Sequence, residues 1–253
     1  MNLFALTIAS LPLLAATPAP AQSIEPREGV RAVAPALEKY RDSTLFGDLW
    51  KRPDLSLRDR SIVTLSALIT RNQTAEMAEY LDLALDSGVK PSEISEIITH
   101  LAFYAGWGDA MAAVAVTKDV FAAREIATEQ LPPPSPRLLA LNAAAEADRA
   151  KRVGELFGTM FPGVTQYTTD VLFRDLWLRP ALAPRDRSLV TISSLVASGQ
   201  VAQLNGHISI GMNNGLTQAE IAEALTHLAF YVGWPNVFSA MPVAKDAFER
   251  RAR

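Results

Sequence analysis

The stretch Thr99-His100-Leu101-Ala102-Phe103-Tyr104 recurs, letter for letter, as Thr226-His227-Leu228-Ala229-Phe230-Tyr231. Each copy runs into a Gly-Trp pair, and the two copies lie 127 positions apart. When residues 58–121 are set against residues 185–248 without gaps, 27 of the 64 positions are identical. Identity of this extent at one fixed offset indicates an internal duplication. The chain therefore consists of two copies of one unit of about 125 residues.

The two copies meet at a proline-rich segment that spans residues 131–136, Leu-Pro-Pro-Pro-Ser-Pro. Proline cannot continue a helix and favours an extended spacer. We therefore expect a first repeat over residues 22–131, a linker over 132–136 and a second repeat over 137–253. Two copies of this length do not make a solenoid, and we interpret them as a fused dimer with a pseudo-two-fold axis.

The apolar pattern within each copy is helical. From Arg60 onward, apolar residues return at the spacing of one helix face, and β-branched residues are too scattered to indicate a sheet. Gly88 and Gly215 stand where helices are expected to end. Thr217 and Glu220 have the spacing of a capping box at the start of the next helix. The sequence predicts an all-α fold with four to six helices in each repeat.

Composition excludes several classes of function. The chain has no cysteine, which removes disulfides, thiolate nucleophiles and thiolate metal sites. Lys and Arg number 24 against 27 Asp and Glu, for a net charge of -3, so no basic excess exists for contacts with nucleic acid. Proton transfer must therefore use carboxylates or the three histidines, which are His100, His207 and His227.

The N-terminus resembles a secretory signal peptide. Residues 3–16 are apolar and uncharged, and Ala19-Pro20-Ala21 fits a small-x-small cleavage site. The run is too short for the roughly 20 residues of a membrane span. We expect residues 1–21 to be removed, which places the protein in the periplasm or outside the cell. The alternative is an N-terminal helix of the mature fold, since no Lys or Arg precedes the apolar run.

The two copies differ in the helix before each Gly turn. Glu76 and Tyr80 are four residues apart in repeat 1, and Gln203 and His207 are their counterparts in repeat 2. Residues at this spacing share one face of a helix. Repeat 2 thus presents an imidazole where repeat 1 presents a phenol, so repeat symmetry does not demand His207 for structural reasons.

The motifs of repeat 2 resemble the carboxymuconolactone decarboxylase family, the all-helical group that also contains the alkylhydroperoxidase AhpD. They are Arg187-Ser188-Leu189-Val190-Thr191, Gln203-Leu204 with His207, Asn213-Asn214-Gly215-Leu216-Thr217, Glu220-Ile221-Ala222-Glu223 and Tyr231-Val232-Gly233-Trp234-Pro235. Repeat 1 matches more loosely. The resemblance implies an AhpD-like helical fold, here duplicated. It also implies a homo-oligomer, a trimer of this fused chain by analogy.

The resemblance implies acid–base chemistry on a small acidic lactone, without a metal or an organic cofactor. The peroxidase branch uses a CxxC pair on the helix of residues 76–80 and 203–207, so peroxidase activity is excluded in a chain without cysteine. The decarboxylase branch resembles repeat 2. It implies a cofactor-free decarboxylase that acts on a small carboxylated lactone or a related keto acid.

Several residues then have expected roles. His207 is the candidate proton donor, because imidazole titrates near neutrality. Gln203 or Glu76 would orient His207 or the substrate. Arg187 would receive a substrate carboxylate in a bidentate manner. The remaining predicted substrate-binding residues are His227, Tyr231 and Trp234.

Structural alternatives stand beside these roles. His100 and His227 recur in both halves, which favours structural histidines, and Glu96 and Glu223 would then form ion pairs with them along one helix face. Arg60 and Arg187 suit buried ion pairs as well as they suit substrate binding. Core or pocket-wall positions explain Trp107 and Trp234. A metal site made of Glu223, His227 and His207 is disfavoured.

A second class of function is a catalytically silent helical module that serves binding or oligomerisation. The replacement of histidine by Tyr80 in repeat 1 is one step in that direction. The two hypotheses differ in what they expect of His207. In a catalytic site, His207 should face a pocket and have a perturbed pKa. In a catalytically silent module, it should be packed in the core or fully exposed.

Overall fold

The computed structural model describes residues 26–158 and 160–252, and these residues contain twelve α-helices and no strand. The predicted signal peptide over residues 1–21 lies outside the described residues. The helices of the first half are α1 Pro26–Val33, α2 Pro35–Tyr40, α3 Leu57–Thr70, α4 Met77–Asp86, α5 Pro91–Tyr104 and α6 Trp107–Ala123. Those of the second half are α7 Ala143–Phe157, α8 Pro162–Tyr167, α9 Pro184–Ala197, α10 Val201–Asn213, α11 Gln218–Val232 and α12 Trp234–Ala252.

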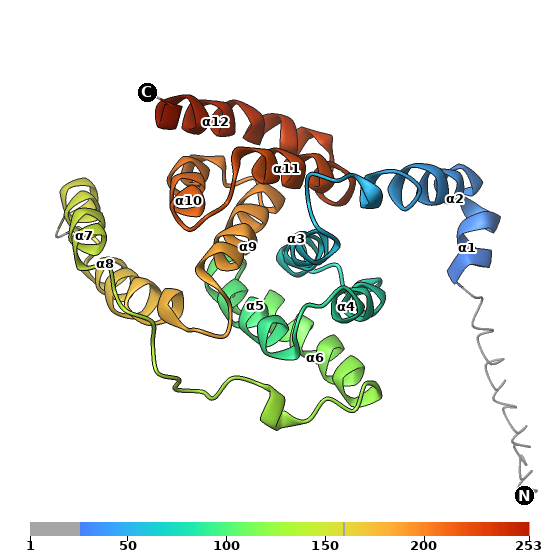
Figure 1. The fold of residues 1–253 in the computed structure, drawn as a ribbon, viewed down its shortest axis with the longest axis horizontal. Helices are drawn as coiled ribbons and strands as arrows, with labels where there is room; N and C mark the ends of the chain where they lie inside the picture. The colour runs from blue at the N-terminus through green and yellow to red at the C-terminus, as the bar shows by residue number, and fades with distance from the viewer. Residues whose placement is uncertain (1–25, 159, 253) are drawn as a thin grey trace, which may run out of the picture.

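The second half repeats the element order of the first (Figure 1). A π-helical turn and a 3-10 turn precede the long central helix in both halves, at Arg41–Leu45 and Leu49–Lys51 and again at Thr168–Phe173 and Leu176–Leu178. The predicted all-α, duplicated fold is confirmed, with six α-helices in each half.

The expected helix boundaries follow from local chemistry. At the start of α11, the Glu220 backbone N–H donates to the Thr217 hydroxyl, and the Thr217 backbone N–H donates to the Glu220 carboxylate. These reciprocal bonds satisfy backbone donors that a helix start leaves free. Gly88 and Gly215 end α4 and α10 with φ of 91° and 104°, a region that favours glycine. The capping box and both glycine stops are confirmed.

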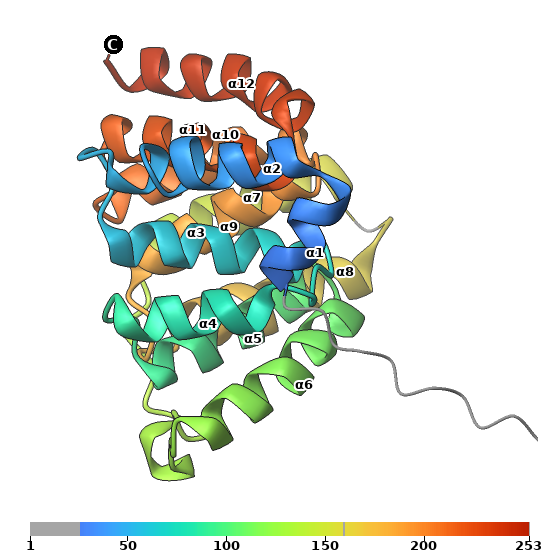
Figure 2. The same ribbon diagram turned by 90° about the vertical axis from the view of Figure 1, so that its right-hand side faces the viewer.

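The centre of the molecule is a pair of helices, one from each half. Helices α3 and α9 pack against each other, and most of their residues are buried. Helix α11 of the second half packs on α3 of the first, and α5 of the first half packs on α9 of the second. In Figure 2 the helices form a stack with α12 at one end, α6 at the other and α3 with α9 in the middle. The two halves therefore share one core.

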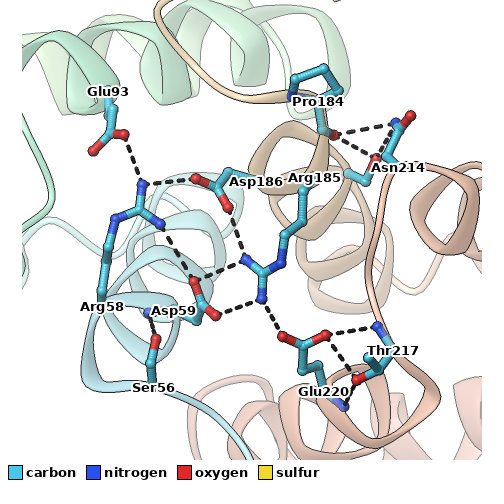
Figure 3. Close-up of polar contacts among 11 residues, drawn as sticks. Ser56, Arg58, Asp59, Glu93, Pro184, Arg185, Asp186, Asn214, Thr217 and Glu220 are labelled. Carbon is cyan, nitrogen blue, oxygen red and sulfur yellow. Dashed lines mark hydrogen bonds and ion pairs between the residues drawn. The ribbon is translucent and has the colours of Figure 1, made fainter.

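Reciprocal ion pairs join the starts of α3 and α9 (Figure 3). Arg58 Nη2 lies 2.7 Å from the carboxylate of Asp186, and Arg185 Nη2 lies 2.7 Å from that of Asp59. The members of each pair come from different halves, and the offset of 127 converts one pair into the other. This arrangement is what a pseudo-two-fold axis between the copies predicts.

The proline-rich segment runs without regular structure between α6 and α7 (Figure 1). Arg179 of the second half holds it by donating to the backbone oxygens of Pro133 and Pro134. Among the helices of residues 26–158 and 160–252, none combines the length and the apolar character that crossing a membrane requires.

Candidate functional site

Two buried polar and aromatic clusters lie between the halves, and each draws residues from both. The His207 site contains residues of α5 together with residues of the second half, namely Glu96, His100, Tyr104, Trp177, Arg187, Thr191 and His207. The Tyr80 site is its counterpart and contains residues of α11 together with residues of the first half, namely Trp50, Arg60, Thr64, Tyr80, Glu223, His227 and Tyr231. One copy alone would supply half of each site.

A buried imidazole forms the base of the His207 site. Arg187 Nη1 lies 3.3 Å from His100 Nδ1, and His100 Nε2 lies 2.7 Å from Thr191 Oγ1. A guanidinium only donates, so Nδ1 accepts and the proton of the neutral ring is on Nε2. The Thr191 hydroxyl in turn donates to the backbone oxygen of Arg187. Burial, then the charge of Arg187, holds the pKa of His100 well below its ordinary value, so the ring is neutral at pH 7.

Arg187 is enclosed by protein. Its side chain has no exposed surface, and Nη2 lies 3.0 Å from the carboxylate of Glu96, which Arg179 also contacts at 2.8 Å. The counterpart is built in the same way, with Arg60 and Arg52 on Glu223. Burial alone would raise the pKa of Glu223, but the hydrogen bonds from Arg52 and Arg60 lower it. Each buried carboxylate is thus matched by arginines of the opposite half.

Aromatic rings hold His207 above this base. Trp177 stacks on its imidazole with ring centroids 5.9 Å apart and planes inclined by 17°. The Tyr104 ring meets the imidazole edge-on at 5.5 Å, and the Tyr104 hydroxyl accepts from Trp177 Nε1 at 2.9 Å. Among the described residues, His207 Nδ1 is buried and has no hydrogen-bond partner. Burial lowers the pKa of His207 to about 4.

The Tyr80 site has a tyrosine in place of His207 and a closed hydrogen-bond chain. Trp50 Nε1 donates to the Tyr231 hydroxyl at 2.9 Å, and the Tyr231 hydroxyl donates to that of Tyr80 at 3.2 Å. The Trp50 ring stacks on Tyr80 with centroids 6.3 Å apart. Burial, with the neighbouring Tyr80, raises the pKa of Tyr231 above its ordinary value. The phenol is thus partnered where the imidazole of His207 is free.

The structure places the predicted site residues in four separate locations. His207 and Gln203 share α10, with Gln203 exposed, and Arg187 lies in the same site. His227 and Tyr231 belong to the Tyr80 site. The remaining two are Glu76, exposed one turn before Tyr80, and Trp234, which lies on an apolar groove of about 650 Å³ between α11 and α12.

The expectation that all of these residues surround one substrate requires correction. The copies interlock, so the His207 ring of α10 meets Tyr104 of α5 from the other half, and Tyr231 of α11 meets Tyr80 of the first half. His207 therefore meets His100 and Tyr104, whereas His227 and Tyr231 meet Tyr80.

Two interpretations of charged residues also change. Glu96 and Glu223 do not pair with the histidine one turn further along the helix, because arginines of the opposite half take both carboxylates. For Arg187 the geometry matches the buried ion pair. A substrate carboxylate would reach it only by displacing Glu96 or His100.

Sequence reasoning did not assign Tyr104, Trp177 and His100 to the site of His207. Tyr104 and His100 lie in the duplicated stretch that decides the fold, and Trp177 lies in a Leu-Trp pair that also recurs. Duplication marks these residues as important to both copies. It does not reveal that a copy contributes them to its neighbour's site.

Metal binding finds no support in the arrangement. Within the described part of the chain, no group of three or more His, Asp or Glu side chains is placed to hold an ion. His207 and His227 belong to different sites, so they cannot serve one metal together with Glu223.

Comparison with known proteins bears on both halves. The sequence pattern of the carboxymuconolactone decarboxylase family matches residues 35–119 and again residues 162–246. The chain is 39% identical over 75 residues to 4-carboxymuconolactone decarboxylase of Acinetobacter baylyi, which covers 30% of this chain and 56% of that protein. It is 35% identical over 77 residues to nitrosuccinic acid decarboxylase npaB of Metarhizium robertsii, covering 30% of this chain and 54% of that protein.

The chain thus spans about half the length of the curated relatives it matches. The family pattern, by contrast, recurs in both halves and takes in more than half of the chain. The two matched ranges coincide with the two helical halves described above. With its two copies of the family pattern fused in tandem, this chain belongs to the carboxymuconolactone decarboxylase family.

Proposed function

We propose that the chain is a cofactor-free decarboxylase that acts on a small carboxylated lactone or a related keto acid in the His207 site. The observation that carries the proposal is the free Nδ1 of His207, a buried nitrogen with no partner among the described residues. A buried polar atom left without a partner is costly, so its retention favours a role in binding or catalysis. Its counterpart Tyr80 has no such free group.

The names of the two relatives support this substrate class. One names a decarboxylase of a carboxylated lactone, and the other names a decarboxylase of a nitro acid. Carbonyl and nitro groups both delocalise the negative charge that remains on carbon when CO2 leaves. We infer that the substrate of this chain is a small carboxylic acid with such a group near the scissile bond.

Decarboxylation requires a proton donor, and we assign this role to His207. The carbon–carboxylate bond breaks, CO2 departs without the electron pair, and the resulting carbanion must gain one proton. A pKa of about 4 makes the free imidazole neutral at pH 7. The negative charge of a bound substrate raises that pKa, because an opposite charge nearby favours the protonated ring. His207 then takes a proton from solvent and delivers it to carbon.

The other residues of the site would position the His207 ring and the substrate. Trp177 and Tyr104 fix the plane of the His207 ring, and the neutral His100 ring, held by Arg187, stacks on Tyr104 with ring centroids 4.7 Å apart. Gln203 lies one turn before His207 on α10 and is exposed, so a substrate that approaches His207 from solvent can contact it.

The test is turnover by purified wild-type protein and by His207→Gln, with 4-carboxymuconolactone and nitrosuccinic acid as substrates and CO2 release as the readout. We expect loss of about 10²- to 10⁴-fold in kcat/KM, the range for removal of a general acid–base group. Tyr80→Phe is the matched control, because it changes the equivalent position of the other site. Equal turnover by wild type and His207→Gln would refute the site. A wild-type chain inert toward both acids would refute the substrate class and favour the silent module.

A further inference from the structure

A cleft of about 280 Å³ opens beside the Tyr80 site. Its walls come from the first π-helical turn and from α4, and they consist of Arg41, Asp42, Phe46, Glu79, Tyr80 and Leu83. One face is therefore aromatic and aliphatic, and the other is charged. Small-molecule sites typically combine an apolar wall with a few convergent polar groups.

The cleft already holds a cation of the protein's own. The guanidinium carbon of Arg41 lies 5.0 Å from the centre of the Phe46 ring, within the range of a cation–π contact. Arg41 Nη2 also lies 2.8 Å from the carboxylate of Glu79. The Glu79 side chain keeps 66% of its surface exposed, so solvent or a ligand can reach it. An aromatic face and a carboxylate thus converge on one positive group.

Negative charge exceeds positive charge around this cleft. Of the charged residues that line it, Asp42 and Glu79 are acidic and Arg41 is basic, and Glu76 is close by. The excess negative charge also acts on Tyr80, at the buried end of the cleft. The pKa of the Tyr80 phenol is raised first by burial and then by the charges of Glu76 and Glu79, although the Tyr231 hydroxyl and Arg41 oppose the shift.

The corresponding positions of repeat 2 carry no charge. The offset of 127 places Thr168, Thr169, Gln203 and Gly206 where repeat 1 has Arg41, Asp42, Glu76 and Glu79, while Phe173 matches Phe46. The aromatic wall is thus shared, and in the second half Arg149, paired with Glu146, lies 4.4 Å from the Phe173 ring centre. The two places differ in access to the carboxylate, because the Glu79 side chain is 66% exposed and the Glu146 side chain is 6% exposed.

We propose that the cleft beside Tyr80 binds a small organic cation, an ammonium or guanidinium group on a flat apolar body. The cationic group would occupy the place of the Arg41 guanidinium, over Phe46 and against Glu79 and Asp42. Its apolar body would pack on Tyr80 and Leu83. Arg41 competes for the same position, because its own guanidinium occupies the cleft in the free protein. This site is separate from the proposed decarboxylase site and does not depend on that activity.

The experiment measures binding of two probes of the same shape and opposite charge, benzylammonium and benzoate, to the full chain by calorimetry. We expect benzylammonium to bind and benzoate not to bind. Arg41→Ala removes the internal competitor, so it should tighten benzylammonium binding about tenfold. Glu79→Gln should weaken it about tenfold, since it removes the carboxylate that faces the cation. Glu155→Gln, which removes an exposed carboxylate on α7, should leave it unchanged.

Two results would overturn the proposal. In the first, benzoate binds better than benzylammonium and Arg41→Ala abolishes its binding, which would make the cleft an anion site. In the second, the Arg41→Ala protein binds no benzylammonium up to about 10 mM, which is weaker than any specific recognition of this probe. Far-UV circular dichroism of each variant establishes that it folds. Because no substrate of decarboxylation is present, failure here leaves the proposed function of the His207 site untouched, and the reverse also holds.

Discussion

Arg187 of the second half and Glu96 of the first form an ion pair in which neither side chain has exposed surface, with Nη2 3.0 Å from the carboxylate. Arg60 and Glu223 repeat the pair in the opposite sense. A buried charge is tolerated only when it is paired and hydrogen-bonded. These pairs therefore require that both halves fold together, and they hold the two clusters beneath His207 and Tyr80 in place.

Removal of one partner should be costly. We expect Glu96→Gln to lower the free energy of unfolding by about 3 kcal/mol, because it leaves the buried charge of Arg187 poorly compensated. Urea denaturation followed by circular dichroism measures the change. Glu155→Gln removes an exposed carboxylate that lies 3.9 Å from Lys151, and it should cost less than about 0.5 kcal/mol. Equal stability of the two variants would show that the buried pair contributes nothing.

Stability should also fall in mild acid because of His207. Its pKa is about 4 in the folded protein against an ordinary value of 6.5, so the unfolded chain binds more protons between these pH values. The stabilisation is complete above pH 6.5 and is lost as pH falls toward 4. Between pH 7 and pH 4, His207→Gln should lose about 3 kcal/mol less of its free energy of unfolding than the wild type loses. Urea titrations at the two pH values measure this. Parallel curves for wild type and variant would mean that His207 is not buried in its neutral form.

The indole of Trp177 depends on a single acceptor in the structure, the Tyr104 hydroxyl at 2.9 Å. Tyr104→Phe keeps the ring beside His207 and removes only that oxygen. We expect a loss of about 1–3 kcal/mol in the free energy of unfolding, the cost of a buried donor left unpaired. Tyr40→Phe is the control, because its side chain is 58% exposed. A Tyr104→Phe protein as stable as that control would contradict the contact.

The interlocked halves give a prediction about fragments. Residues 26–131 and 137–253 should associate when they are co-expressed, since α3, α5, α9 and α11 bury one shared core. Each fragment made alone should lack the cooperative unfolding of the full chain, because it exposes the core face of its central helix. Affinity purification of one tagged fragment, followed by thermal unfolding of the complex, checks both statements. A lone fragment that unfolds cooperatively as a monomer would refute the shared core.

The fold was largely accessible from the sequence. Repetition of the stretch around His100 is visible by comparing the sequence with itself. Apolar spacing and helix-stop glycines at 88 and 215 are local signals, and the structure confirms what all of them predict. The capping box at Thr217 is of the same kind. Such features depend on residues a few positions apart, and therefore they can be recognised along the chain.

The composition of the sites was not accessible in the same way. Tyr104 lies 103 positions before His207, and only the packing of α5 on the second half brings them together. The same packing places Glu96 on Arg187 instead of beside His100. Spacing within one helix predicted partners on that helix. The partners come from the other half, because two copies that share a core exchange helices across it.

Because each site combines both copies, a homodimer of single copies would display every substitution twice, once in each of two identical sites. Joining the copies in one polypeptide removes that constraint. A mutation at position 80 now alters one site and leaves the one at 207 unchanged, so a phenol and an imidazole can occupy equivalent places. The fusion thus lets the chemistry on one side of the axis change independently of the other side.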